Sequence, residues 1–139
     1  MHVKSIGDTL VIRLERGEEL VNSLMAICAQ QGVTLGVVSG LGAVDQATVG
    51  LYRVAEKQYH ATELTGEREM VSLTGNVTTQ AGKVYLHLHA AFADDTAAVT
   101  GGHLNAARIS ATAEIFIRRL PGAVERFKDE KIGLNFMDV

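Results

Sequence analysis

Apolar and polar residues alternate with a period of two along most of the chain. This period is typical of β-strands with one face buried and the other exposed. In residues 108–118, for example, isoleucine and alanine alternate with arginine, threonine and glutamate. Strands are predicted at residues 10–14, 34–38, 48–53, 59–64, 69–79, 83–92, 99–104 and 108–118. The links between most of them are short and rich in Gly, Asp and Lys, which predicts a mainly antiparallel sheet.

One segment, residues 18–31, has a helical period instead. Its apolar residues recur at a spacing that places them on one buried helix face: Leu20, Val21, Leu24, Ile27 and Cys28. Glutamates in the first turn and a glycine after the last are typical of the two ends of a helix. The sequence therefore predicts an α+β fold with one main amphipathic helix, and it predicts Cys28 as a core residue.

A glycine-containing stretch at residues 39–43, SGLGA, resembles the start of a dinucleotide-binding loop. Asp45 stands where the third glycine of that loop would be, and residues 46–52 alternate like a strand where a helix would be required. We interpret the stretch as a bulge or tight bend in the sheet. The segment 122–131 is polar and mixed in charge, which predicts a solvated helix or loop.

Composition narrows the class of protein. The chain has 139 residues, of which 47% are hydrophobic, and this size predicts a single domain over residues 1–139. The formal net charge is −3, and no cluster of lysine or arginine provides a basic face for phosphate. A single cysteine, together with the lack of a signal-like apolar run or a membrane-spanning length, predicts a cytoplasmic protein.

Three of the five histidines define the main candidate site. His87 and His89 project from the same face of one predicted strand, about 6 to 7 Å apart. His103 follows 14 residues later, after a turn that can bring it beside them. Three imidazoles with no fourth protein ligand are typical of an open zinc site, in which one coordination position stays free. The alternative is that these histidines simply lie on an exposed strand face and bind no metal. His2 and His60 have no such partners and are interpreted as surface residues.

Polar residues close in sequence or in register are candidates to orient these imidazoles. They are Asp94, Asp95, Asn105 and Glu114. If strands 83–92 and 108–118 are neighbours, Glu114 shares the face of the histidines and is the best acid/base candidate. Arg13 or Arg108 would then serve as an anion partner.

Several separated motifs resemble the plant-and-prokaryote conserved (PPC) domain family. They are HLHAAFADD at 87–95, VTGGHL at 99–104, AEIFI at 113–117, RLERGEEL at 13–20, SGLGA at 39–43 and SLTGNV at 72–77. Together they span roughly residues 8 to 137 in the family's order. One departure is GEREMV at 66–71, where plant members carry a Gly-Arg-Phe-Glu-Ile-Leu segment that engages transcription factors.

The resemblance implies a PPC-like α+β fold assembled as a homotrimer, with zinc held by His87, His89 and His103. It also implies a DNA-binding or transcription-associated role, although the chain has no Arg-Gly-Arg core of an AT-hook. The alternative is a small metal-dependent enzyme, because acetolactate decarboxylase is similar at fold level and also holds zinc with three histidines. In that case a small molecule would bind at the metal.

Overall fold

The computed structural model describes all residues, 1–139, and consists of eight strands and one helix. Four of the strands, with 11 to 23 residues, are much longer than a typical strand of five or six residues. The elements are β1 (His2–Ile6), β2 (Thr9–Glu15), α1 (Leu20–Gln30), β3 (Gly36–Arg53), β4 (Gln58–Gln80), β5 (Lys83–Ala93), β6 (Val99–Arg119), β7 (Arg126–Lys128) and β8 (Asn135–Met137).

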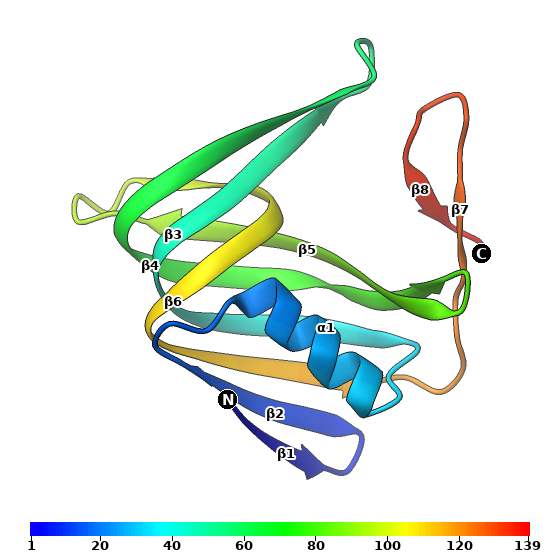
Figure 1. Ribbon diagram of the computed structural model, residues 1–139, viewed down its shortest axis with the longest axis horizontal. Coiled ribbons are helices and arrows are strands. Elements are labelled where there is room, and N and C mark those ends of the chain that lie inside the picture. The colour runs from blue at the N-terminus through cyan, green and yellow to red at the C-terminus, as the bar shows by residue number, and fades with distance from the viewer.

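Six strands form one antiparallel sheet in the order β1-β2-β6-β3-β4-β5. The sheet is strongly bent, and the tip of the β3–β4 hairpin projects away from the rest (Figure 1). The start of β6 turns back to pair with β5, so that β3, β4, β5 and β6 close on one another. The two short strands β7 and β8 form a separate hairpin near the C-terminus.

Helix α1 packs on one face of this sheet and confirms the predicted amphipathic helix (Figure 1). Its stripe is buried at Leu20, Leu24, Ile27 and Cys28. Burial raises the pKa of the Cys28 thiol to about 12, as expected for a core residue. With 11 residues, the helix is too short to cross a membrane.

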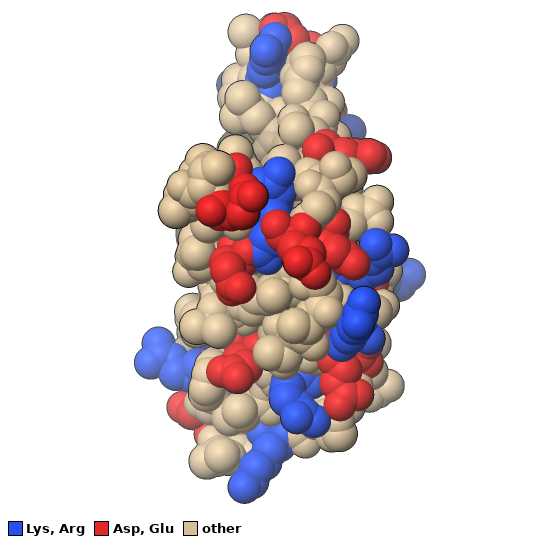
Figure 2. Space-filling view, turned by 90° about the vertical axis from the view of Figure 1, so that its left-hand side faces the viewer, with Lys and Arg blue, Asp and Glu red and all other residues tan.

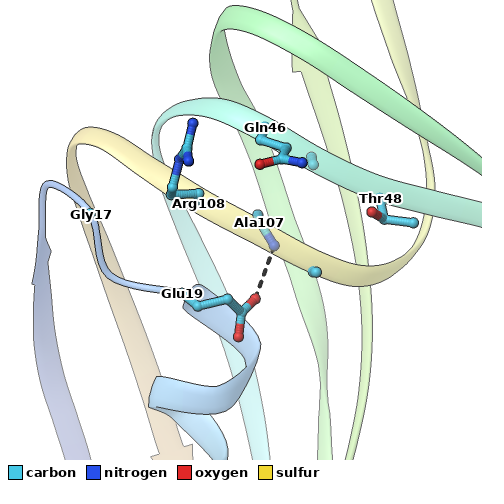
Figure 3. Close-up of a pocket in the computed structure, with 8 residues that line it drawn as sticks. Gly17, Glu19, Gln46, Thr48, Ala107 and Arg108 are labelled. Carbon is cyan, nitrogen blue, oxygen red and sulfur yellow. Dashed lines mark hydrogen bonds between the residues drawn. The ribbon is translucent and has the colours of Figure 1, made fainter.

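The carboxylate of Glu19 fixes the start of this helix. It accepts hydrogen bonds from the backbone N–H groups of Val21 and Asn22, and so caps the first turn. It also accepts the N–H of Ala107 on β6 at 3.0 Å (Figure 3). A cleft of about 260 Å³ opens beside it. One acidic side chain therefore ties the helix to the sheet.

Several predicted segments merge into longer strands. The predicted strands 34–38 and 48–53 merge into a single strand, β3, which begins at Gly36 and whose register shifts at Gly40/Gly42 and Val44/Gln46. This confirms the predicted bulge in SGLGA. The predicted strands 59–64 and 69–79 are likewise one strand, β4, without a turn between them, and Gly66 adopts a φ of +88° within it. A glycine with positive φ is compatible with a bulge as well as with a turn.

The ends of the chain were predicted less well than its centre. Strand β1 was missed, because its residues are exposed on both faces and show no alternation. The segment 122–131 was predicted as solvated, yet Arg126 on β7 is only 8% exposed. Its guanidinium donates hydrogen bonds to groups of β4 and β8, which explains the burial of a charged residue.

Candidate metal centre

Strand β5 supplies two of the three histidines. Leu88 and Ala90 point into the core, whereas His87 and His89 lie on the opposite face, as the alternation predicted. His87 is half-buried and His89 is exposed. Gly75 on β4 lies opposite Leu88 in the ladder, and a Cβ there would overlap the carbonyl oxygen of His87. The missing side chain lets the two strands approach closely beside the histidines.

The turn after β5 brings the third histidine back. A side-chain oxygen of Asp94 accepts hydrogen bonds from the backbone N–H groups of Thr96 and Ala98 and from the Thr96 hydroxyl. These bonds lower the pKa of the Asp94 carboxyl. The returning strand β6 then pairs with β5 so that His103 stands directly opposite His89. All three histidines therefore come from one chain.

The geometry of the three imidazoles fits a divalent metal. One ring nitrogen from each histidine lies within 4.8 Å of the other two. The Nε2 atoms of His87 and His89 are 3.2 Å apart, and two ligands at the usual zinc–nitrogen distance on a tetrahedron are separated by about 3.3 Å. The ring centroids of His87 and His103 are 5.2 Å apart, and those of His89 and His103 are 5.5 Å apart.

Burial and neighbouring charge favour the neutral form of His87 and His103, which is the form that binds metals. Burial, aided by the charges of His103, His89 and Arg126, lowers the pKa of His87 to about 4. Burial and the charge of His89 also lower the pKa of His103. Neutral imidazole is the ligating form, so at neutral pH no proton needs to leave His87 before a metal binds.

One of the predicted supporting residues lies beside the site. The Tyr59 ring meets the edge of His103 with centroids 5.9 Å apart. Its hydroxyl donates a short hydrogen bond to the side-chain oxygen of Asn105. Burial raises the pKa of this hydroxyl, and the bond to Asn105 partly offsets that effect. Sequence reasoning named Asn105 but not Tyr59, which lies 44 residues before His103 in the chain.

The other predicted partners lie elsewhere. Glu114 is opposite Arg13 on β2 and Leu41 on β3, because the β5–β6 ladder covers only the first five residues of β6. The assumed pairing of strands 83–92 and 108–118 is therefore wrong, and Glu114 does not lie beside the histidines. Asp94 organises the turn, and Asp95 is exposed in it. Arg108 forms an ion pair with Asp45 at 2.7 Å and lines the small cleft beside Glu19.

The histidines lie in the wall of a cavity of about 670 Å³. Strands β3 and β4 contribute Tyr52 and Tyr59, and β5 contributes Tyr85. The C-terminal segment adds mostly apolar side chains: Leu134, Phe136, Met137 and Val139. Arg126 completes the wall, 4.6 Å from the centre of the Tyr85 ring. Sequence reasoning missed this cavity, since residues 126–139 carry no recognisable motif.

Comparison with known proteins identifies relatives over most of this chain. The Plants and Prokaryotes Conserved (PCC) domain matches residues 1–121. The structure of a metal-containing protein from Archaeoglobus fulgidus is 34% identical with a TM-score of 0.88, and covers 96% of this chain and 94% of that one. A plant- and prokaryote-conserved (PPC) protein from Pyrococcus horikoshii is 32% identical with a TM-score of 0.89, and covers 97% and 94%.

Two further structures bear on the proposed roles. A protein from Bacteroides thetaiotaomicron, named as a candidate DNA-binding protein, is 27% identical with a TM-score of 0.96, and covers 99% of this chain and 96% of that one. Acetolactate decarboxylase from Bacillus subtilis is 10% identical with a TM-score of 0.53, and covers 93% of this chain and 60% of that one. The likeness to acetolactate decarboxylase concerns the fold alone. No curated protein matches the sequence.

Proposed function

Since the chain belongs to the Plants and Prokaryotes Conserved domain family, we propose that it is a metal-binding protein whose three histidines hold zinc. The observation that carries this proposal is the convergence of three imidazole nitrogens within 4.8 Å. His87, His89 and His103 would be the ligands. The metal would supply a Lewis acid with a free coordination position, which suits it to bind a small molecule in the adjoining cavity.

The donor set favours zinc over magnesium or calcium. Imidazole nitrogen suits zinc and other late transition metals, whereas magnesium and calcium prefer oxygen ligands. The neighbour from Archaeoglobus fulgidus is named as metal-containing, which supports a metal in this family. Around the imidazoles, Tyr59 and the apolar C-terminal segment form part of the cavity wall.

Metal content tests the proposal directly. We expect about one zinc per chain in protein purified without a histidine tag, by elemental analysis. His89→Ala should lose the metal, and the matched variant His60→Ala should keep it, because His60 is exposed and contacts Glu56 away from the site. A wild-type protein with less than about a tenth of an equivalent after incubation with zinc would overturn the proposal.

We further propose that the protein is a homotrimer. The support is an exposed apolar patch on β3 and β6, formed by Val37, Leu41 and Phe116 on the outer side of the sheet. A patch of large apolar side chains on a surface is typical of a protein contact. Light scattering should give three times the 14.9 kDa mass of one chain. Phe116→Asp should reduce that mass to one chain, and an unchanged monomer mass for the wild type would contradict the trimer.

A DNA-associated role is the second candidate function, and the name of the Bacteroides thetaiotaomicron neighbour supports it. The net charge of −3 opposes it, and on the face shown in Figure 2 basic and acidic side chains are interspersed. Fluorescence anisotropy with a duplex at low and moderate salt tests it. Binding that weakens steeply with salt would support the role, and no binding at low salt would exclude it.

The metal-dependent enzyme is the alternative, and its support is the open three-histidine arrangement next to a cavity. Glu114 is too far along β6 to act there. The Tyr59 hydroxyl donates to the backbone carbonyl of His103 and its ring packs on the His103 ring, so Tyr59 becomes the acid/base candidate. Any turnover found with zinc-loaded protein should fall strongly in Tyr59→Phe.

A further inference from the structure

Arg126 is the one charged residue buried in this protein. Its exposed fraction is 8%, and its guanidinium lies over the Tyr85 ring in the cavity wall. Three hydrogen bonds hold it: Nε donates to the Thr78 hydroxyl, Nη1 to the carbonyl of Asn135, and Nη2 to the side-chain oxygen of Asn76. All three acceptors are neutral. The positive charge has no counterion among its protein partners.

This contrasts with four other arginines of the chain, each of which is less buried and lies within 4.0 Å of a carboxylate. The pairs are Arg13–Glu15, Arg53–Glu56, Arg68–Asp94 and Arg108–Asp45. A buried charge is costly unless it is paired and hydrogen-bonded. The hydrogen bonds to neutral groups orient the Arg126 guanidinium without neutralising it. Two of its five N–H groups remain for a further acceptor.

The guanidinium lies in the same cavity wall as the candidate metal centre. Asn76, which accepts from Nη2, stands opposite His87 in the β4–β5 ladder. Tyr85, over which the guanidinium lies, is two residues before His87 on the same strand face, a separation of about 6 to 7 Å. Arg126 and His87 line the same cavity, so one small molecule can contact both groups.

The rest of the cavity is mostly apolar and carries no acidic side chain. Among its lining residues are Leu51, Leu134, Phe136 and Met137, and none is Asp or Glu. A volume of about 670 Å³ falls within the range of small-molecule sites, roughly 300 to 1,000 Å³. Such a wall combines one positive charge and three candidate metal ligands with apolar side chains. It suits a ligand that has an anionic end and an apolar body.

We propose that this cavity binds a small organic acid, with its carboxylate paired to Arg126 and its apolar body against the C-terminal segment 134–139. The planar guanidinium matches a carboxylate through two parallel hydrogen bonds. The proposal rests on the metal site for its second contact, in which an oxo or hydroxyl oxygen of the same acid approaches the metal beside His87. The ligand thereby supplies the counterion that the protein lacks.

Titration calorimetry on the zinc-loaded protein tests this with 4-methyl-2-oxopentanoate and its uncharged methyl ester as probes. We expect the acid to bind at least about tenfold more tightly than the ester, since a hydrogen bond to a charged group contributes about 1.5 to 3 kcal/mol. Arg126→Gln should abolish that difference and retain one zinc per chain. Arg108→Gln, the matched control in the small cleft, should keep the difference.

Equal binding of acid and ester to zinc-loaded wild type, or binding of neither, would overturn the organic-acid proposal with the metal site intact. If the metal-site proposal itself fails, the protein binds no zinc even before any acid is added. That outcome is therefore distinct from failure of the organic-acid proposal. Arg126 also holds Asn76 and Asn135, so Arg126→Gln removes two contacts of the wall as well as the charge. Equal binding of acid and ester to wild-type protein overturns the proposal without any variant. A preference for the acid that persists in full in Arg126→Gln would place the carboxylate on the metal and overturn its pairing with Arg126.

Discussion

His89 and His103 stand directly opposite each other across the β5–β6 ladder, with ring centroids 5.5 Å apart. A pair in this position shares one face of the sheet, and the ladder fixes the separation of the two backbones. His87 joins it from the next position on the same face of β5. The three candidate ligands therefore depend on two adjacent strands and not on a flexible loop.

We expect zinc to stabilise the folded protein through this arrangement. A ligand that binds only the folded state adds about 2.7 kcal/mol to the free energy of unfolding at a free concentration about 100-fold above its Kd. The melting temperature should therefore rise by several degrees when zinc is added to metal-free protein. Differential scanning fluorimetry measures this shift.

His103→Ala should remove this zinc-dependent rise, because two imidazoles bind the metal much more weakly than three. His2→Ala serves as the control, since His2 contacts Glu15 at 2.9 Å on the exposed strand β1. A rise in melting temperature of equal size in wild type and His103→Ala would show that zinc binds elsewhere on the chain.

The stability of the metal-free protein should depend on pH through His87. Its pKa is lowered from 6.5 to about 4 by burial first and by neighbouring positive charge second. Between these two values the unfolded chain binds a proton that the folded chain does not. The free energy of unfolding should therefore fall as pH decreases from about 6.5 to about 4, and level off below that range for this group.

Urea unfolding of metal-free protein at a series of pH values measures the dependence. His87→Gln places a neutral side chain at this position and should flatten the curve in the same range. His60→Gln, at an exposed histidine of β4, should leave the slope unchanged. A slope that persists in full in His87→Gln would assign the titration to other groups.

Glu19→Ala should destabilise the protein by about 2 kcal/mol. Loss of a helix N-cap costs about 0.5 to 2 kcal/mol, and the buried Ala107 N–H loses its acceptor as well. Glu114→Ala is the matched control, an exposed glutamate of β6 for which we expect a change within about 0.5 kcal/mol. Urea titration compares them, and equal effects would argue against the tie between helix and sheet.

The sequence was sufficient for features that depend on local periodicity. The strand face of His87 and His89 and the buried stripe of the helix follow from spacing alone, and both are confirmed. The return of His103 needed one further assumption, a turn between the two strands. That turn is visible in the sequence as Ala93-Asp94-Asp95, and Asp94 organises it. The candidate ligands could therefore be found before the structure.

The surroundings of the ligands could not be found in this way. Glu114 was expected beside the histidines only if strands 83–92 and 108–118 are neighbours, whereas β6 pairs with β5 at residues 99–103 alone and residues 108–118 pair with β2 and β3. Arg126 was interpreted as solvated because charged residues are usually exposed. Its burial depends on Asn76 and Thr78, about 50 residues earlier in the chain, and no local pattern records that contact.

Gly75→Ala should weaken metal binding more than its effect on stability alone explains. The added Cβ would overlap the carbonyl oxygen of His87 and lie 2.8 Å from Cδ2 of Leu88. Because the overlapped oxygen belongs to the backbone, β4 and β5 must separate and carry His87 with them. Overpacking of this kind costs about 1 to 3 kcal/mol, and the displaced imidazole should also raise the zinc Kd at least several-fold.

Gly82→Ala separates these two effects. Gly82 lies in the turn between the same two strands with a φ of +73°, and a Cβ there meets no atom within 4 Å. Alanine at that φ is strained, by about 1 to 2 kcal/mol, but the strain does not reach the backbone of His87. Zinc titration and urea unfolding of both variants should therefore show a similar loss of stability, with a higher zinc Kd in Gly75→Ala alone. An unchanged Kd in Gly75→Ala would mean that the close approach of β4 and β5 does not position His87 for the metal.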